Sequence, residues 1–359
     1  MNAPAPRHRL ARAALADVPL YDPRRAPVAL DLTDNTNRWG VPPHAAAVLR
    51  ALDGEAVTRY PTLYTAELKA ALATRLGVTA DMVVTGCGSD DLLDCAFRAV
   101  AEPDMVVAAP VPSFAMVPLF ARGNALRYVG VPEDAAHQPD LDALLAARPR
   151  ILYLCSPNNP TGVPVARAQL ERAVAEAPGL VVVDEAYAEY AGATVIDLLA
   201  HADNLLVVRT CSKAYGLAGL RVGYAVGAPA LVHEVEKARG PYKVSAPAER
   251  AALAAVRDDA AWVDHHVALA VALRERLADA LRARGLAPLP SGANFVCVPV
   301  PHAVAVGQAL RARGVAVRPF EGLPHVGDAL RISVGPWEQL QAFLDAFDAV
   351  RAGARGTAA

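Results

Sequence analysis

The feature that most constrains the fold is a series of short apolar runs separated by stretches with helical periodicity. Near-continuous apolar runs of this length are typical of parallel strands that are covered by helices on both faces. The sequence therefore predicts an α/β fold with a mostly parallel sheet. The expected strands are MVVTG (82–86), MVVAAP (105–110), LRYVGV (126–131), ILYLCS (151–156), LVVVDEA (180–186), NLLVVRT (204–210) and VGYAVG (222–227).

The pattern along the chain predicts three parts. Residues 1–35 are rich in proline and are expected to form an N-terminal arm, and residues 36–237 carry the predicted sheet in a large α/β domain. Residues 238–359 are expected to form a small α+β C-terminal domain, because helical stretches dominate there before a second set of strands. The strands expected in this last part are 294–300, 314–320 and 330–335.

Composition argues against several classes of protein. Lys and Arg number 35 against 37 Asp and Glu, so neither a basic nucleic-acid surface nor an acidic tail is indicated. No apolar run has the length of a membrane span. The five cysteines stand singly, which predicts reduced thiols in a cytoplasmic protein and neither disulfides nor a metal site.

Two segments suit the binding of polar groups at the ends of strands. TGCGSDDLLDCAFRAV (85–100) has the pattern of a strand, a glycine turn and a helix. The free N–H groups at the start of such a helix suit a phosphate, although an ordinary capped turn explains the pattern too. SPNNPTG (156–162) ends a strand with two asparagines, which either donate hydrogen bonds into a cleft or serve the turn itself.

Two further segments supply a carboxylate and an amine. Asp184 ends a very apolar strand, where ligands bind in open α/β sheets and where a carboxylate needs a cation; a helix cap is the alternative. Lys213 and Arg221 lie in RTCSKAYGLAGLRVGYAVG (209–227). Apolar surroundings lower the pKa of a lysine and make it a nucleophile, whereas most lysines are simply solvated. A phosphate site, a carboxylate and an amine at one sheet edge together indicate pyridoxal 5′-phosphate (PLP).

The motifs resemble those of one enzyme family in both composition and order. The chain is similar to fold-type I PLP enzymes of the class I/II aminotransferases, and most similar to the histidinol-phosphate aminotransferases, from about Tyr21 to the last helix. This resemblance implies transfer of an amino group from an amino acid or amino-phosphate, histidinol phosphate foremost, to a 2-oxo acid such as 2-oxoglutarate. The motifs that carry it are RYP (59–61), GSDD (88–91), SPNNPTG (156–162), DEAY (184–187) and SKAYGLAGLRVGY (212–224).

The resemblance also implies which residues hold the cofactor. Lys213 would bond to it covalently and later move the proton of the substrate, while Asp184 would pair with the ring nitrogen. The ring oxygen O3′ would accept hydrogen bonds from Asn158 and Tyr187, and Phe114 would stack on the ring. The residues implied to hold the phosphate are Gly88, Ser89, Asp90, Ser212 and Arg221.

Further residues are implied to bind the substrate and a second subunit. Arg331 would pair with a carboxylate or phosphate of the substrate, with Arg318, Tyr21 and Asn37 also in contact with it. Tyr60 would reach the phosphate of the other subunit's cofactor, which implies a homodimer with shared active sites.

Departures from the family pattern leave the substrate open. DNTNRWG (34–40) lacks the usual glutamate and carries Arg38 and Trp39, and Lys243 stands where the family commonly has asparagine. Each of these residues either faces the substrate or has no effect on substrate binding. The alternatives are an aminotransferase of specialised metabolism that acts on another amino acid, a related PLP-dependent decarboxylase, and a PLP-fold regulator or scaffold. The intact set of Lys213, Asp184 and Arg221 argues against the last.

Overall fold

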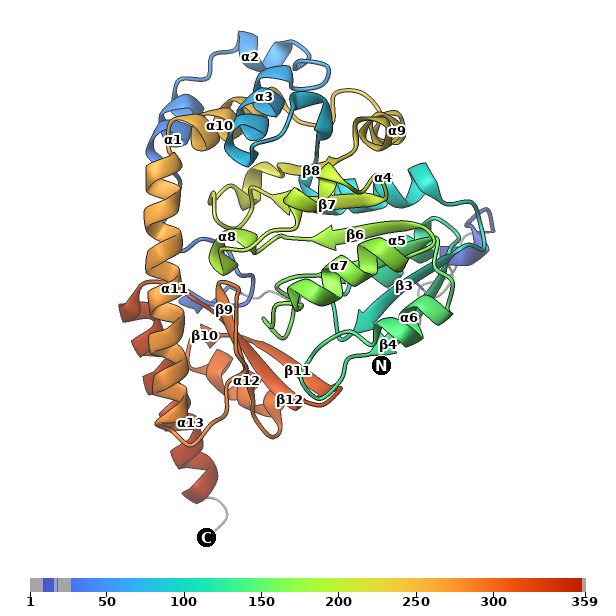
Figure 1. The fold of residues 1–359 in the computed structure, drawn as a ribbon. Coiled ribbons are helices and arrows are strands. Elements are labelled where there is room, and N and C mark those ends of the chain that lie inside the picture. The colour runs from blue at the N-terminus through green and yellow to red at the C-terminus, as the bar shows by residue number, and fades with distance from the viewer. Residues whose placement is uncertain (1–8, 16–17, 19–26, 357–359) are drawn as a thin grey trace.

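A seven-stranded sheet forms the centre of the protein (Figure 1). The computed structural model describes residues 9–15, 18 and 27–356. All seven expected strands are present, in the spatial order β2-β8-β7-β6-β5-β3-β4, and β8 alone among them runs antiparallel to its neighbours. The strands are β2 (Val83–Gly86), β3 (Val106–Val111), β4 (Arg127–Pro132), β5 (Ile151–Cys155), β6 (Leu180–Asp184), β7 (Leu205–Thr210) and β8 (Gly223–Gly227).

Helices cover both faces of this sheet, because successive side chains of each buried strand point to opposite faces. In β5, for example, Leu152 and Leu154 join one apolar cluster, whereas Ile151 and Tyr153 join the other. Helices α3 (Ala66–Leu76), α6 (Leu141–Ala146) and α7 (Arg167–Glu176) pack into the first cluster. The second contains α4 (Gly88–Val100), α5 (Val117–Gly123) and α9 (Pro229–Arg239).

A second, antiparallel sheet lies in the C-terminal part, with the order β11-β12-β9. Its strands are β9 (Phe295–Pro299), β11 (Arg318–Leu323) and β12 (Gly327–Ser333), and it packs on α11 (Ala260–Arg282) and α12 (Ala303–Ala312). α13 (Trp337–Gly356) packs in turn on α12.

The single strand expected at 314–320 was a wrong prediction, because this segment changes partners partway along. Its first half, β10 (Val315–Ala316), pairs in parallel with β1 (Leu30–Asp31), and its second half begins β11. A continuous apolar run cannot reveal such a change of partner.

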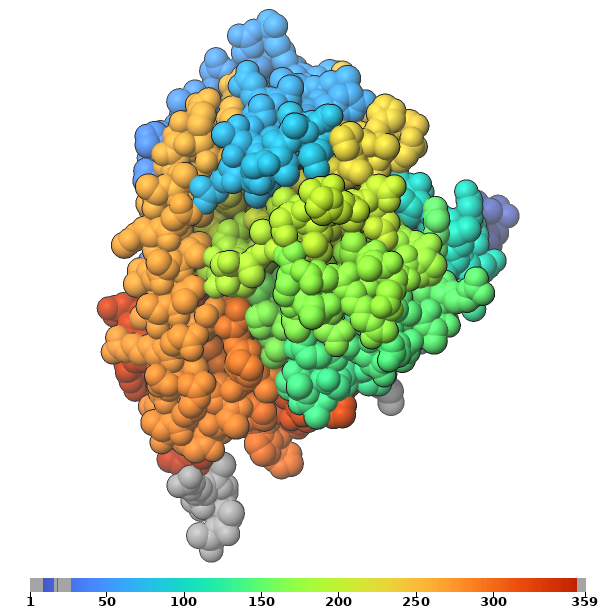
Figure 2. All heavy atoms as spheres, in the orientation of Figure 1, coloured from blue at the N-terminus to red at the C-terminus, as the bar shows by residue number. Residues whose placement is uncertain are grey.

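The remaining helices gather at one end of the molecule and beside the sheet (Figures 1 and 2). α1 (Pro43–Arg50) and α3 both pack against α10 (Ala246–Arg257), although α10 lies in the segment assigned to the small domain. The division at residue 237 stays a prediction. In the described residues, no helix is both long and apolar enough to cross a membrane. The short elements are α2 (Glu55–Thr58), α8 (Ala188–Ala191), η1 (Ala13–Leu15), η2 (Ala80–Met82), η3 (Ile196–Ala200) and η4 (Ala218–Leu220).

Candidate functional site

The site begins at the carboxyl ends of the central strands. Asp184 is the last residue of β6 and lies between Cys155 of β5 and Val208 of β7. Lys213 follows β7 after a two-residue gap. Because ligands of open α/β sheets bind at this edge, the sheet itself brings the predicted carboxylate and amine together.

Asp184 is a buried carboxylate that is held by two neutral donors. Its Oδ2 accepts a hydrogen bond of 2.8 Å from Tyr153 Oη, and its Oδ1 accepts one of 3.1 Å from the backbone N–H of Ala186. Burial raises the pKa of Asp184 to about 6, although both hydrogen bonds act to lower it. A bound cation would stabilise the ionised form of this group.

Lys213 has the properties of an amine that can react near neutral pH. Its Nζ donates a hydrogen bond of 2.8 Å to the carbonyl oxygen of Asp34. Burial lowers its pKa to about 8; the positive charge of Arg331 acts in the same direction, and the negative charges of Asp34 and Asp90 oppose it. Asp34 follows Thr33, which binds Arg331, and Ser212 precedes Lys213 and contacts Arg221, which also contacts Asp90. The structure therefore brings Lys213, Asp90 and Arg331 into one cluster.

The start of α4 comes into close contact with the strand and loop that carry Arg221. Gly88 has a φ of +84°, and a Cβ atom there would lie 2.3 Å from Arg221 Nη2. A Cβ atom at Gly223 would lie 2.3 Å from the carbonyl carbon of Gly88. Only glycine allows both the left-handed backbone and this approach. No side chain caps the helix at Cys87, so N–H groups of its first turn remain available to an anion.

Arg221 links this helix start to the loop of Lys213. Its Nη1 lies 3.4 Å from Ser212 Oγ and its Nη2 3.3 Å from Asp90 Oδ2. Burial raises the pKa of Asp90, and the charge of Arg221 opposes that shift. Ser89 is half-buried in the same turn, and its backbone N would lie 2.4 Å from a Cβ at Gly223. The structure thus gathers all five residues that were predicted to hold a phosphate.

Arg331 of β12 forms the opposite end of the cluster. Its Nη2 donates a 2.6 Å hydrogen bond to the carbonyl oxygen of Thr33, and its Nη1 donates to Asn159 Oδ1. The side chain lies near the rings of Phe295 and Phe320, at 5.4 and 5.7 Å from their centroids. The Nε atom is buried without a hydrogen-bond partner in the described part of the chain.

Arg318 lies directly opposite Arg331 in the β11–β12 pair. Its positive charge contributes to lowering the pKa of Arg331, after the larger effect of burial. The two arginines therefore form a cationic pair on adjacent strands, and the role of Arg318 in substrate binding stays a prediction.

The two asparagines of SPNNPTG have different surroundings. Asn158 is 1% exposed, and its amide bonds to Pro112 O, Glu133 Oε1, Thr161 Oγ1 and Ser113 Oγ. Asn159 instead accepts the hydrogen bond from Arg331. The predicted contact of Asn158 with a ring oxygen does not fit this geometry, because the protein already occupies its amide N–H groups. Identical neighbouring residues gave no sequence signal that could separate the two.

Sequence reasoning also missed Asn35 and Tyr153. Asn35 Nδ2 donates a 3.0 Å hydrogen bond to Tyr187 Oη, and its backbone N–H donates to Ser333 Oγ at 2.8 Å. Asn35 thus connects the predicted cofactor residue Tyr187 to β12. Tyr153 is an inward-facing residue of an apolar strand, so its bond to Asp184 becomes visible only when β5 and β6 are paired.

Three more of the predicted residues make contacts in the structure. Phe114 is half-buried in the loop after β3 and packs against the core cluster that contains α4. Asn37 Nδ2 donates to Ala214 O at 3.2 Å, so its side chain supports the loop of Lys213. Tyr60 is 82% exposed and stacks on Tyr242, with 4.8 Å between ring centroids. Tyr21 lies outside the described residues.

The three departures from the family pattern are held by contacts within the chain. Arg38 donates to Gln339 Oε1 at 2.9 Å and to Asp31 O at 2.6 Å. Trp39 packs against the core and lies 5.9 Å from the ring of His266. Lys243 forms an ion pair of 2.9 Å with Asp91, in the first turns of α4. These contacts favour structural roles over contact with a substrate.

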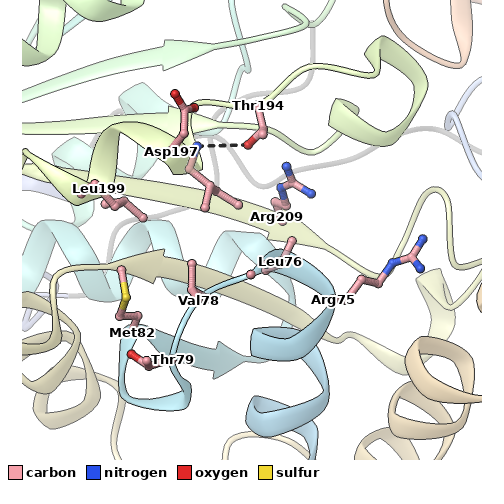
Figure 3. Close-up of a pocket in the computed structure, with 12 residues that line it drawn as sticks. Arg75, Leu76, Val78, Thr79, Met82, Thr194, Asp197, Leu199 and Arg209 are labelled. Atoms are coloured by element: carbon pink, nitrogen blue, oxygen red, sulfur yellow. Dashed lines mark hydrogen bonds between the residues drawn. The ribbon is translucent and has the colours of Figure 1, made fainter.

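A separate cavity of about 790 Å³ lies between the end of α3, η3 and β7 (Figure 3). Its lining includes Arg75, Met82, Leu199 and Arg209, and none of the predicted site residues that the structure describes contributes to it. Both arginines are already paired, Arg75 with Asp264 and Arg209 with Glu185. This cavity is therefore distinct from the cluster around Lys213.

Comparison with known proteins gives the same family as the motifs. The family described as "Aminotransferase class I and II" matches residues 27–347. A histidinol-phosphate aminotransferase from Methylibium petroleiphilum is 44% identical over 319 residues, which cover 86% of this chain and 85% of that protein. An aromatic amino acid aminotransferase from Nocardia farcinica is 38% identical over 93% of this chain and 95% of its own length.

A solved structure agrees in fold over nearly the whole chain. The histidinol-phosphate aminotransferase from Sinorhizobium meliloti, in complex with pyridoxal 5′-phosphate, has a TM-score of 0.82 and 28% identity and covers 91% of this chain and 92% of its own. The predicted fold, family and enzyme class are thereby confirmed. The chain belongs to the class I and II aminotransferases.

Proposed function

We propose that the protein uses pyridoxal 5′-phosphate to transfer the amino group of histidinol phosphate to a 2-oxo acid such as 2-oxoglutarate. The observation that carries this proposal is the single cluster that joins a lysine of lowered pKa, a buried carboxylate and a glycine-lined helix start beside an arginine. Few cofactors other than PLP require all three groups at one sheet edge.

The free state of all five cysteines supports the predicted cytoplasmic location.

The residues of the cluster fit this cofactor. Asp184, whose carboxyl group is buried with two neutral donors, would pair with the protonated ring nitrogen. Gly88, Asp90, Ser212 and Arg221 would hold the phosphate at the start of α4. Bound PLP supplies an electron sink that stabilises the negative charge left when the substrate Cα loses its proton.

Lys213 would act as the base in this reaction. A pKa of about 8 leaves a useful fraction of its Nζ neutral near pH 7, so this atom can take the proton from the substrate Cα and later return one. The carbonyl oxygen of Asp34 holds the Nζ atom from one side. Tyr187 and Asn159 would donate toward the ring oxygen, because the amide N–H groups of Asn158 already bond to Pro112, Glu133 and Thr161.

Arg331 would bind the anionic group of the substrate. It is fixed by Thr33 and Asn159, and each of these contacts uses only one of the two N–H groups on its Nη atom. A carboxylate or phosphate can accept two parallel hydrogen bonds from a guanidinium, and burial strengthens the contact. Arg318 on the next strand supports a substrate or acceptor with a second negative charge.

A second candidate substrate is an aromatic amino acid, which the similarity to the Nocardia farcinica protein supports. We expect a purified holoenzyme given histidinol phosphate, phenylalanine or tyrosine with 2-oxoglutarate to form glutamate fastest with histidinol phosphate. Faster turnover of an aromatic donor would assign the second function. Release of CO₂ without glutamate would instead identify a decarboxylase.

The active unit of this proposal is a homodimer. Large apolar side chains are exposed on α2, the following loop and the loop before α10, which form one end of the molecule (Figure 2). Such a patch typically marks a protein interface. The side chains are Val57, Tyr60, Leu63, Tyr64 and Tyr242.

Subunit mixing tests whether Tyr60 serves the partner's site. In a hybrid of a Lys213→Ala subunit and a Tyr60→Phe subunit, one of the two sites would contain native Lys213 and native Tyr60. We therefore expect mixed, refolded subunits to be more active than either variant alone. Activity that equals the average of the two variants would mean that Tyr60 acts within its own subunit or not at all.

A further inference from the structure

A buried acid lies just behind the candidate site without a role in the proposed chemistry. Glu133 follows β4 and is 3% exposed. Its Oε1 accepts a 2.9 Å hydrogen bond from Asn158 Nδ2. Its Oε2 is buried and has no hydrogen-bond partner among the residues that the structure describes. Burying a carboxyl group is costly, so its retention here calls for a function.

Glu133 and Pro112 together hold the amide of Asn158 in one orientation. Asn158 Nδ2 faces two oxygen acceptors, Pro112 O and Glu133 Oε1, each at 2.9 Å, while Oδ1 accepts from Ser113 Oγ at 3.0 Å. If the amide were turned over, its oxygen would face those two acceptors at contact distance. Because an amide oxygen donates no hydrogen bond, this arrangement selects a single orientation.

The oriented amide joins two loops that reach the candidate site. On one side it holds Pro112 and Ser113, directly before Phe114. On the other it fixes the turn whose next residue, Asn159, bonds to Arg331. Glu133 is thus two side chains removed from the substrate-binding arginine, although it touches neither cofactor nor substrate.

We propose that Glu133 is a positioning residue, which orients Asn158 and thereby holds Asn159 against Arg331 and Phe114 at its place in the site. This inference rests on the proposed function, since it assigns Arg331 to the substrate and Phe114 to the cofactor ring.

The surroundings of Glu133 indicate that it acts as a neutral group. Burial raises its pKa to about 8, with a smaller contribution from Asp134. His137 Nδ1 lies 3.8 Å from Oε2, and the pKa of His137 is itself lowered by burial and by His325. A protonated Glu133 keeps Oε1 as an acceptor for Asn158 and needs no cation. Glutamine has the same reach and the same acceptor, so it should replace Glu133 well.

Variants of Glu133 separate positioning from simple stabilisation. Glu133→Ala removes the acceptor, Glu133→Asp keeps the acid but shortens its reach, and Glu133→Gln keeps both reach and acceptor. Glu236→Ala is the structural control, since Glu236 bonds to Lys69 and Arg239 between α3 and α9. Thermal unfolding reports the effect of each variant on stability, and succinate binding to the holoenzyme, followed by its absorbance, reports on Arg331.

We expect Glu133→Ala and Glu133→Asp to weaken succinate binding and raise the KM of the amino donor by about tenfold, as for loss of one buried hydrogen bond. The kcat should change less than the KM. Glu133→Gln should stay within about twofold of the parent protein, as expected when the hydrogen bond is kept. Glu236→Ala should lower the melting temperature without changing the KM.

The proposal is wrong if both Glu133→Ala and Glu133→Asp bind succinate and the amino donor as well as the parent protein does. It is also wrong if Glu133→Gln weakens this binding as much as they do. If Glu133→Ala does not fold, the pair of Asp and Gln variants decides alone. Failure of the proposed function would show differently, as absence of turnover in the parent protein. Crystal structures of the apo variants then remain decisive: the Asn159–Arg331 contact should be lost with Asp and kept with Gln, and the opposite result contradicts the proposal.

Discussion

The two ends of the candidate site are built in different ways. The phosphate end is formed where α4 and Arg221 meet across neighbouring strands of the large sheet, with Gly88 and Gly223 allowing backbone contact. The substrate end joins Arg331 to the carbonyl oxygen of Thr33, which is 298 positions away in the sequence and lies outside that sheet. Neighbouring strands of one sheet therefore position the first end, whereas the second depends on contacts between β12 of the smaller sheet and the segment that follows β1.

This difference predicts two kinds of defect. Changes at the phosphate end should weaken cofactor binding, and changes at the substrate end should raise the KM while the cofactor stays bound. Lys213 lies between the two ends, and its loss should affect turnover most of all.

Lys213→Ala should lower kcat by about 10²–10⁴-fold or more, since 10²–10⁴-fold is the usual contribution of a positioned general base. The variant should still bind PLP without a covalent bond, because Asp184 and the phosphate end remain. Lys243→Ala is the matched control, since Lys243 pairs with Asp91 and should leave turnover nearly unchanged. Borohydride reduction of the parent protein and peptide mapping should find the label on Lys213; a label on another lysine would disprove the assignment.

Arg331→Ala should raise the KM for acidic donors by about 10–150-fold, as expected from losing a charged hydrogen bond worth roughly 1.5–3 kcal/mol. The dissociation constant of PLP should stay the same. Arg318→Ala, on the neighbouring strand, should have a smaller effect. Steady-state kinetics and cofactor titration measure both quantities, and a large loss of PLP affinity in Arg331→Ala would remove the contrast between the two ends.

Gly88→Ala should weaken PLP binding by about tenfold or more, because its Cβ would lie 2.3 Å from Arg221 Nη2 and push aside a charged hydrogen bond worth roughly 1.5–3 kcal/mol. Gly192→Ala serves as control: its φ is +64°, but no atom lies within 4 Å of the added Cβ. Cofactor titration compares the two. Equal PLP affinity in both variants would show that the close approach of Arg221 is unimportant.

Tyr153→Phe should have the smallest effect, about 0.5–1.5 kcal/mol for one hydrogen bond. The bond to Tyr153 lowers the pKa of Asp184, which burial raises to about 6, so its removal moves that pKa upward. An ionised Asp184 strengthens PLP binding, so PLP affinity should fall as the pH drops through the pKa of Asp184. In Tyr153→Phe this fall should occur at a higher pH than in the parent protein. Titration of PLP between pH 5 and 8 measures the shift. If PLP affinity falls at the same pH in Tyr153→Phe as in the parent protein, the prediction is wrong.

The pH dependence of the apo protein follows from the same carboxyl group. A folded-state pKa of about 6 lies above the ordinary value of 3.8, so the folded protein binds more protons than the unfolded chain between these values. The contribution of Asp184 to stability is therefore present at low pH and lost as the pH rises toward 6.

Much of the fold was predictable because each buried strand carries its own signal. The seven apolar runs all became strands of one sheet, and Asp184 and Lys213 were found because both follow such a run. The segment at 314–320 was misjudged because its two halves pair with β1 and β12, and pairing partners leave no mark on a short apolar run.

The candidate site shows the same limit at single residues. Asn158 and Asn159 are chemically identical neighbours, and only the positions of Glu133, Pro112 and Arg331 decide which of them faces the scaffold. The sequence left open whether Arg38 faces the substrate, and its contact with Gln339, 301 positions away, forms only in the folded chain.

The amino-acid sequence by itself determined the sheet, the family and the residues proposed to bind a phosphate and a pyridine ring, since these depend on local patterns along consecutive residues. Tertiary structure alone decided which asparagine meets Arg331, which tyrosine supports Asp184 and where Glu133 lies. The physical reason is that a hydrogen bond depends on the distance and direction between two groups, and for residues 25 to 172 positions apart both are set only when the strands and loops have packed.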